Sequence, residues 1–270
     1  MTSHAPIGLF DSGVGGLTVL SALCEELPNE DFVYLGDTAR VPYGSKSSHT
    51  VVRYAENNAH TLMAQHNLKM LVIACNTASA VALKPLQEQL DIPVLGVIQP
   101  GARAALEHQP NTIAVLGTRG TLNAGAYDIE LKKLGYGGRI MHQACPLFVP
   151  LAEEGWISGP ITEKIAETYL EPLMKKCDAF ILGCTHYPLF LPLLREHWPQ
   201  ATFIDSAAST AEHVKQELKN RNLLNPKTEK SSSLFRVTDH PDNFLMLAKH
   251  FLSFSIGPED VAHLEVTSKP

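Results

Sequence analysis

The stretch LVIACNT occupies residues 71–77, and FILGCTH at residues 180–186 repeats its pattern. Each is an apolar run, a small residue, a cysteine and two polar residues, and each precedes a segment of helical length. A second pair is formed by LFDSG at 9–13 and VLGTR at 115–119, where an apolar run enters a glycine-containing turn. These repeats predict two similar halves, each with a cysteine at the carboxyl end of a strand.

Short apolar runs alternate with longer helix-length segments along the chain. Strands are expected at residues 7–10, 32–35, 70–74, 94–97, 112–116, 139–143, 179–182 and 202–204. Helices are expected at residues 47–65, 77–90, 121–134, 159–175 and 189–198. This alternation predicts an α/β fold with mostly parallel sheets that helices cover on both faces. In such folds ligands bind beyond the carboxyl ends of the strands, where both cysteines are expected.

The segment after residue 206 has a weaker pattern. Helices are expected at 207–223 and 242–251, with a polar loop at 225–233. Because the second half ends naturally at the strand 202–204, we expect this tail to return to the first half. The predicted domains are therefore residues 1–97 together with 207–270, and residues 98–206.

Composition excludes several classes of protein. The 44% apolar and 19% charged residues are ordinary for a globular chain, and the net charge of −6 argues against binding nucleic acid through its phosphates. No apolar run approaches the ~20 residues of a membrane span. The N-terminus MTSHAPIGLFDSG lacks the pattern of a signal peptide, and the five cysteines lack a disulfide framework. We expect a cytoplasmic protein with reduced thiols and with neither a membrane nor a nucleic acid as partner.

Cys75 and Cys184 are the main candidates for chemistry. A single cysteine is most often a small buried hydrophobe, but two at matching positions are hard to explain as packing. A thiol between a strand and a helix lies near backbone N–H groups and the positive helix end, which favour the thiolate. The residues that follow the two cysteines are polar: Asn76, Thr77, Thr185 and His186.

Two facing thiols have four interpretations. Reducing conditions disfavour a disulfide. A metal site has poor ligand sets, since neither cysteine belongs to a CxxC motif. A Cys-His hydrolase needs one cysteine only. Inversion of a carbon centre needs a base on one face and an acid on the other, and this two-base proton transfer uses both cysteines and both halves.

Three other segments offer polar groups. The turn DSGVGG at 11–16 matches neither of the common nucleotide-binding motifs. Its backbone N–H groups could instead bind a carboxylate. In such a site Asp11 would bind the substrate ammonium or set the protonation state of a neighbouring group. PYGS at 42–45 is typical of a loop turn. Thr118 and Thr121 place two hydroxyls at a strand-to-helix junction, where capping the helix is an equal alternative to ligand binding.

These motifs together resemble the glutamate racemase family. The matching stretches are FDSGVGGL (10–17), VPYG (41–44), ACNTAS (74–79), GVIQPG (96–101), GTRGT (117–121), CPLFVPLAEEG (145–155) and GCTHYP (183–188). They occur in the family's order and cover roughly residues 7 to 206. As a set they are highly specific, although any one alone is weak.

The resemblance implies two flavodoxin-like three-layer domains with the active site between them, and an isomerase that needs neither pyridoxal phosphate nor metal. It assigns Cys75 and Cys184 as the catalytic bases, Asp11 as the group that assists Cys75, and Glu153 and His186 as those near Cys184. The substrate contacts that it implies are Asp11, Ser12, Tyr43, Gly44, Asn76, Thr77, Thr118, Thr121, Thr185 and His186. The implied role is to supply D-glutamate for peptidoglycan synthesis. A homodimer is a candidate assembly.

Related activities remain as alternatives. Aspartate racemase is the nearest, and the paired cysteines do not separate the two; the histidine of GCTH and the Pro-Tyr-Gly loop favour glutamate by resemblance. Some family members also bind DNA gyrase as inhibitors, which here would be an additional role. Other members need a cell-wall precursor as activator and carry a longer segment before the first strand. Only six residues precede Ile7, so we expect no such activation.

Overall fold

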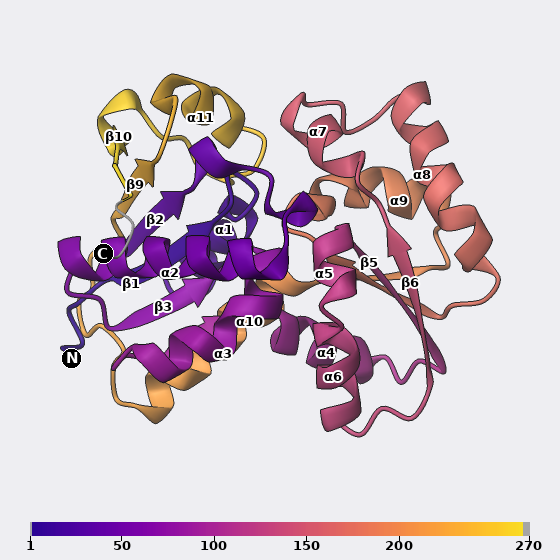
Figure 1. Ribbon diagram of the computed structural model, residues 1–270, viewed down its shortest axis with the longest axis horizontal. Helices are drawn as coiled ribbons and strands as arrows, with labels where there is room; N and C mark the ends of the chain where they lie inside the picture. The colour runs from indigo at the N-terminus through magenta and orange to yellow at the C-terminus, as the bar shows by residue number, and fades with distance from the viewer. Residues whose placement is uncertain (1, 267–270) are drawn as a thin grey trace.

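The computed structural model describes residues 2–266 and contains two parallel sheets side by side (Figure 1). Sheet A has the order β10-β9-β2-β1-β3-β4, and sheet B has the order β6-β5-β7-β8. The strands of sheet A are β1 (Ile7–Asp11), β2 (Phe32–Gly36), β3 (Met70–Ile73), β4 (Val94–Gly96), β9 (Ser233–Val237) and β10 (Val261–His263). Those of sheet B are β5 (Thr112–Gly117), β6 (Arg139–Ala144), β7 (Ala179–Gly183) and β8 (Thr202–Asp205). The predicted α/β fold with parallel sheets is confirmed.

Both halves share one strand order, because β2-β1-β3-β4 in sheet A corresponds to β6-β5-β7-β8 in sheet B. In the first half β1 pairs with β3, and in the second half β5 pairs with β7. Cys75 follows β3 and Cys184 follows β7, so the two cysteines occupy equivalent places at the carboxyl ends of equivalent strands. The predicted internal repeat is therefore confirmed by the topology.

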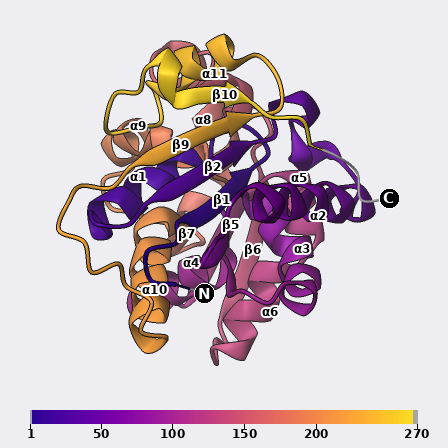
Figure 2. The same cartoon turned by 90° about the vertical axis from the view of Figure 1, so that its left-hand side faces the viewer.

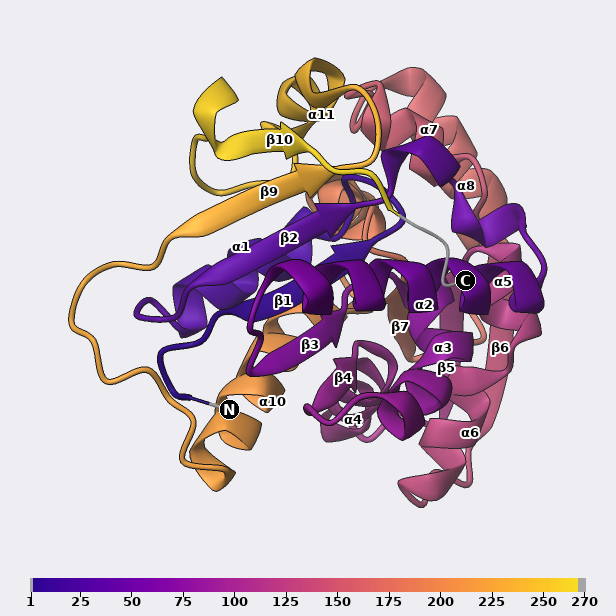
Figure 3. The ribbon, with the colours of Figure 1, turned by 60° about the vertical axis from the view of Figure 1, so that its left-hand side comes forward.

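Helices cover the faces of both sheets, as Figures 1 and 3 show. The α-helices are α1 (Leu17–Glu26), α2 (Ser48–Gln65), α3 (Asn76–Gln89), α4 (Ile98–Glu107), α5 (Arg119–Asn123), α6 (Ala126–Lys133), α7 (Phe148–Glu153), α8 (Pro160–Met174), α9 (Leu191–His197), α10 (Ser206–Asn220) and α11 (Pro241–Ala248). Short 3₁₀ turns are η1 (Thr38–Arg40), η2 (Tyr43–Ser45), η3 (Tyr187–Phe190) and η4 (Pro258–Asp260).

The alternation of side chains along each strand divides the core. In β1, Leu9 packs into the cluster that holds α1, whereas the next residue, Phe10, packs into the cluster that holds α2 and α3. Burial of both faces explains why most strands are continuous apolar runs. One exception is β6, an edge strand whose side chains are exposed or half-buried.

Two predicted helices are divided in the structure. The prediction of one helix over 121–134 is wrong, because Gly125 adopts φ +63° and separates α5 from α6. The prediction of a helix over 189–198 starts too late and misses η3, the 3₁₀ turn that precedes α9. Pro188 lies at the start of η3 and Pro192 at the start of α9, where a missing backbone N–H is tolerated.

The tail after residue 206 carries two strands that the sequence pattern did not reveal. β9 and β10 extend sheet A beyond β2 (Figure 2). β9 begins at the end of the segment predicted as a loop and buries only alternate residues, and β10 has three residues. α10 packs against both α1 and α4, so it touches elements of both halves. The domain boundaries at 97/98 and 206/207 stay a prediction.

A buried ion pair holds the tail at the amino end of sheet A. Lys69 precedes β3 and pairs with the carboxylate of Glu30, and both side chains are almost fully buried. The Lys69 ammonium also donates to the carbonyl oxygens of Ser3 at 2.6 Å and Leu223 at 3.0 Å. Glu30 accepts from the backbone N–H of Asn225 at 2.8 Å. The pair thus joins the N-terminus, β3 and the start of the tail.

None of the helices within residues 2–266 combines the length and the apolar character that crossing a bilayer requires.

Candidate active site

Cys75 lies between β3 and α3, as the residue that precedes the first turn of the helix. It is buried, and its Sγ donates to Ser12 Oγ at 3.8 Å. Burial and, next, the negative charge of Asp11 raise the pKa of Cys75 to about 12. A backbone N–H of α3 lowers this pKa, as expected, but together with Ser12 it only partly offsets the loss of water, so the net shift is upward. Cys75 is a thiol at neutral pH.

Asp11 ends β1, beside the end of β3. Its side chain is fully buried, and Oδ2 accepts the backbone N–H of Gly13 at 2.9 Å. The other oxygen, Oδ1, has no hydrogen-bond partner within residues 2–266. Burial raises the pKa of Asp11, while the charge of His186 lowers it. An unpaired buried carboxylate oxygen is costly and marks a place where a ligand donor is expected.

Cys184 directly follows β7, and its Sγ lies 3.8 Å from Nδ1 of His186. On the other side of the ring, His186 Nε2 lies 3.0 Å from Glu153 Oε1 at the end of α7. Burial alone would lower the pKa of His186, but hydrogen bonds to Cys184 and Glu153 raise it to about 10. The imidazole is therefore protonated at neutral pH and places a positive charge beside the Cys184 sulfur.

The tail helps to enclose this histidine. The ring of Phe251 packs edge-on against the imidazole of His186, with centroids 5.4 Å apart. The backbone N–H of Ser253 donates to Ser21 Oγ of α1 at 3.1 Å, which holds the same segment on the first half. Phe251 carried no signal in the sequence, because it lies far from every motif.

The two halves also meet beside His186. Thr18 Oγ1 donates to the carbonyl oxygen of Thr185 at 3.1 Å. A methyl group on Gly15 would overlap the side chains of Thr185 and His186. The glycine therefore lets the turn after β1 reach the second half.

Gly15→Ala is expected to lower kcat/KM for any reaction at these thiols by about 100-fold, because the two halves must move apart by a fraction of an ångström. Gly137→Ala is the matched control, since a methyl group there meets no atom of residues 2–266 within 4 Å. Steady-state kinetics of the two variants check the effect. Equal activities would show that the close approach at Gly15 does not position the site.

Three hydroxyls meet between the halves. Thr77 Oγ1 of α3 lies 2.9 Å from Thr118 Oγ1 and 3.1 Å from Thr121 Oγ1, which are themselves 3.0 Å apart. Thr118 also accepts the backbone N–H of Thr121 at 3.2 Å, so it caps α5 as well. A methyl group on Gly44 would lie 2.6 Å from Thr118, which places the η2 turn against this cluster. Three hydroxyl donors at one point suit a carboxylate.

The Tyr43 hydroxyl is engaged within the first half. It donates to the carboxylate of Asp37 and accepts from Asn58 Nδ2 at 3.0 Å. Asp37 also accepts from Arg40 Nε at 2.9 Å and from Thr238 Oγ1 at 3.0 Å. In the structure these hydrogen bonds hold the η2 turn, so the Tyr43 hydroxyl is not free to contact a substrate. Asp37, which directly follows β2, was missed in the sequence although its place at a strand end was a usable signal.

Asn76 links the site to a second residue that the sequence did not indicate. Its Nδ2 donates to the hydroxyl of Tyr127 at 2.9 Å, and its Oδ1 is buried with no partner in the described chain. Tyr127 belongs to α6 in the second half. No motif included it, because its position depends on how the halves meet.

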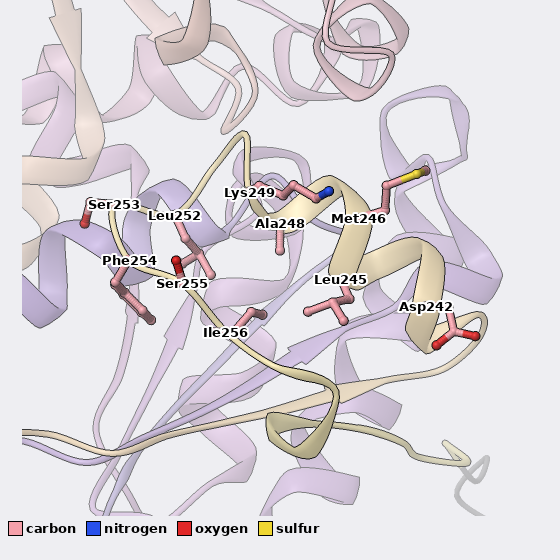
Figure 4. A pocket seen from close by; sticks show the side chains of 10 residues that line it. All are labelled: Asp242, Leu245, Met246, Ala248, Lys249, Leu252, Ser253, Phe254, Ser255 and Ile256. Atoms are coloured by element: carbon pink, nitrogen blue, oxygen red, sulfur yellow. The ribbon is translucent and has the colours of Figure 1, made fainter.

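A separate hollow lies away from these residues. A cavity of about 570 Å³ runs along α11 and the segment that follows, and none of the predicted site residues lines it (Figure 4). A smaller cavity of about 100 Å³ is lined by Glu153, by Gly13 and Val14 of the turn after β1, and by the start of α11. Glu153 in its wall is the residue that contacts His186.

Comparison with known proteins identifies the family. The model of the Asp/Glu/Hydantoin racemase family matches residues 17–214. The chain is 45% identical to the glutamate racemase of Geobacter metallireducens over 254 residues, covering 93% of this chain and 94% of that protein. Among solved structures, it is similar to the glutamate racemase of Thermus thermophilus in complex with β-chloro-D-alanine, with 41% identity, a TM-score of 0.89, and coverage of 98% and 99% of the two chains.

The glutamate racemase of Francisella tularensis in complex with D-glutamate gives 36% identity, a TM-score of 0.91, and coverage of 99% and 100% of the two chains. Aspartate racemase of Picrophilus torridus, at 17% identity, a TM-score of 0.55, and coverage of 82% and 99%, shares the fold alone. The chain thus belongs to the Asp/Glu/Hydantoin racemase family and, within it, to the glutamate racemases, which are amino-acid isomerases.

Proposed function

We propose that this protein interconverts L-glutamate and D-glutamate in the cytoplasm by two-base proton transfer without a cofactor, and supplies D-glutamate for peptidoglycan. The observation that carries the proposal is a pair of thiols at equivalent strand ends, each beside ionisable partners. Burial and Asp11 raise the pKa of Cys75, whereas the Cys184 Sγ lies 3.8 Å from the ring of His186, which Glu153 holds. An acid and a base of one chemical type suit inversion of a carbon centre.

In the proposed reaction of L-glutamate, the Cys184 thiolate removes the α-proton and becomes a thiol. Cys75 then gives its proton to the opposite face of the carbanion and becomes the thiolate. D-glutamate reacts through the same steps in reverse. The imidazolium of His186, held by Glu153, lies beside Cys184, and Asp11 makes the Cys75 thiolate a stronger base.

Substrate binding follows from the polar groups between the halves. The hydroxyls of Thr77, Thr118 and Thr121 each have a hydrogen to donate, so a substrate carboxylate would replace their mutual hydrogen bonds. The unpaired oxygen of Asp11 is an acceptor and suits the substrate ammonium. We further propose Ser12, Gly44 and Thr185 as contacts, because they lie beside these groups.

The direct test is an assay with the purified protein. After dialysis against a chelator, and with no cofactor added, optical rotation of an L-glutamate solution is expected to decay to zero, and a D-glutamate solution is expected to do the same. L-aspartate under the same conditions is the control for the nearest related activity. Loss of activity that pyridoxal phosphate or a metal restores would contradict the proposal, and so would faster racemisation of aspartate.

A pH dependence follows from His186, whose pKa is raised to about 10. The imidazolium persists as pH rises to that value, and above it the site loses the positive charge beside Cys184. We therefore expect kcat/KM to fall above about pH 10, equally in both directions, because the equilibrium constant between the enantiomers is one. His186→Gln is expected to lower kcat/KM at pH 8 by about 10²-fold and to abolish this fall. A variant that keeps the same alkaline fall would assign it to another group.

A further inference from the structure

Tyr127 reaches across from the second half to the residue that follows Cys75. Its ring is buried among apolar residues of the sheet B core. A methyl group on Gly183 would lie 3.1 Å from the ring, and one on Gly101 would lie 3.4 Å from the hydroxyl. Two positions without side chains therefore make room for the phenol, which is held by packing on both sides.

The hydroxyl of Tyr127 accepts a hydrogen bond from Asn76 Nδ2 at 2.9 Å. Asn76 is the first residue of α3, and its side chain is buried as well. A carboxamide is planar, and its nitrogen and oxygen point about 120° apart, so a hydrogen bond that holds Nδ2 also sets the direction of Oδ1. That oxygen has no partner within residues 2–266.

A second unpaired acceptor lies on the neighbouring strand. Asp11 ends β1, which pairs with β3 immediately before Cys75 and Asn76, and Asp11 Oδ1 is also buried without a partner among the described residues. Buried polar atoms are rarely left unpaired, and a carboxamide oxygen and an ionised carboxylate oxygen only accept. Two acceptors beside the thiols are complementary to a cationic group with several hydrogens, such as an α-ammonium.

We propose that Tyr127 is a positioning residue, which orients the Asn76 carboxamide from the opposite half so that Oδ1 accepts a hydrogen bond from the substrate ammonium. This inference rests on the proposed function, because the ammonium is that of glutamate. Since Tyr127 and Asn76 belong to different halves, the acceptor is aligned only while the halves are together. Binding of the amino group is thereby coupled to closure of the site around the α-carbon.

The test compares Tyr127→Phe with Tyr136→Phe. Each change removes one hydroxyl and keeps the ring, but the Tyr136 hydroxyl donates to the Asn111 carbonyl oxygen at 2.9 Å, away from the site. The probes are L-glutamate, D-glutamate and glutarate, which has both carboxylates but no ammonium. In Tyr127→Phe we expect KM for both glutamates to rise about tenfold, the equivalent of one aligned hydrogen bond, and kcat to change less than about twofold. The inhibition constant of glutarate is expected to stay at the wild-type value.

Calorimetric binding of L-glutamate and glutarate to the same variants separates this inference from the proposed function. A wild type that binds glutamate without racemising it contradicts the proposed function, yet the binding comparison still tests Tyr127. A Tyr127→Phe variant that binds glutamate as the wild type does overturns the inference. Equal weakening of glutamate and glutarate also overturns it, because the lost contact would then be to a carboxylate or to the site as a whole. A wild type that binds neither compound overturns both.

Discussion

Replacement of either Cys75 or Cys184 by serine is expected to stop glutamate racemisation but to leave proton abstraction by the other cysteine intact. A serine hydroxyl keeps the shape of the site but is a poor base at neutral pH, so the rate should fall by about 10³-fold or more. The two variants are separated with a glutamate analogue that carries chlorine at the β-carbon. After its α-proton is removed, such an analogue expels chloride and needs no second acid.

Each variant should then process one enantiomer of the analogue. By resemblance to the family, Cys184 removes the proton from the L form and Cys75 removes it from the D form. Cys75→Ser should therefore eliminate chloride from the L analogue only, and Cys184→Ser from the D analogue only. Chloride release, measured for both enantiomers with each variant, checks the assignment. If one variant processes both enantiomers equally, a single group reaches both faces and the two-base proposal fails.

Lys69→Met is expected to lower the free energy of unfolding by about 3–5 kcal/mol, because it leaves the buried Glu30 carboxylate without a counter-charge. The loss is a large part of the total stability of a typical domain, about 5–15 kcal/mol. It arises at the amino end of sheet A, where Lys69 also holds the carbonyl oxygens of Ser3 and Leu223. Chemical denaturation of the purified variant measures it.

Two further variants make this prediction specific. Lys84→Met removes a lysine whose 3.8 Å ion pair with Glu88 is exposed, so it should change stability by less than about 0.5 kcal/mol. The double variant Lys69→Met with Glu30→Gln removes the uncompensated charge and keeps an acceptor for the N–H of Asn225. It should therefore be more stable than Lys69→Met alone. A single variant as stable as the wild type would show that the buried pair does not hold the tail.

Most of the architecture could be predicted from local patterns. Apolar runs buried on both faces are continuous in the sequence, so the strands β1 to β8 were located to within a residue or two, and the repeated cysteine pattern indicated two equivalent halves. The tail was predicted less well. β9 and β10 lie near the edge of sheet A, are short, and bury few side chains, so their pattern resembles that of a loop.

The residue types at the site were also visible in the sequence, because thiols, hydroxyls and carboxylates stood after strand ends, where an α/β sheet presents them together. Their catalytic and binding roles stay predictions. Protonation was not visible: the pKa of Cys75 depends on burial and on Asp11, which lies 64 positions earlier in the chain. These are through-space effects, and no local pattern records them.

The contacts between the halves were the least predictable part. The Tyr43 hydroxyl belonged to a family motif, yet Asp37 holds it within the first half, whereas Tyr127 belonged to no motif and meets Asn76. Strand and helix propensity depends on neighbours in sequence, so it indicates which segments form and where each strand ends. Hydrogen bonds between distant side chains depend on how the two sheets pack together, and this packing sets which polar groups are paired and which remain free for a ligand.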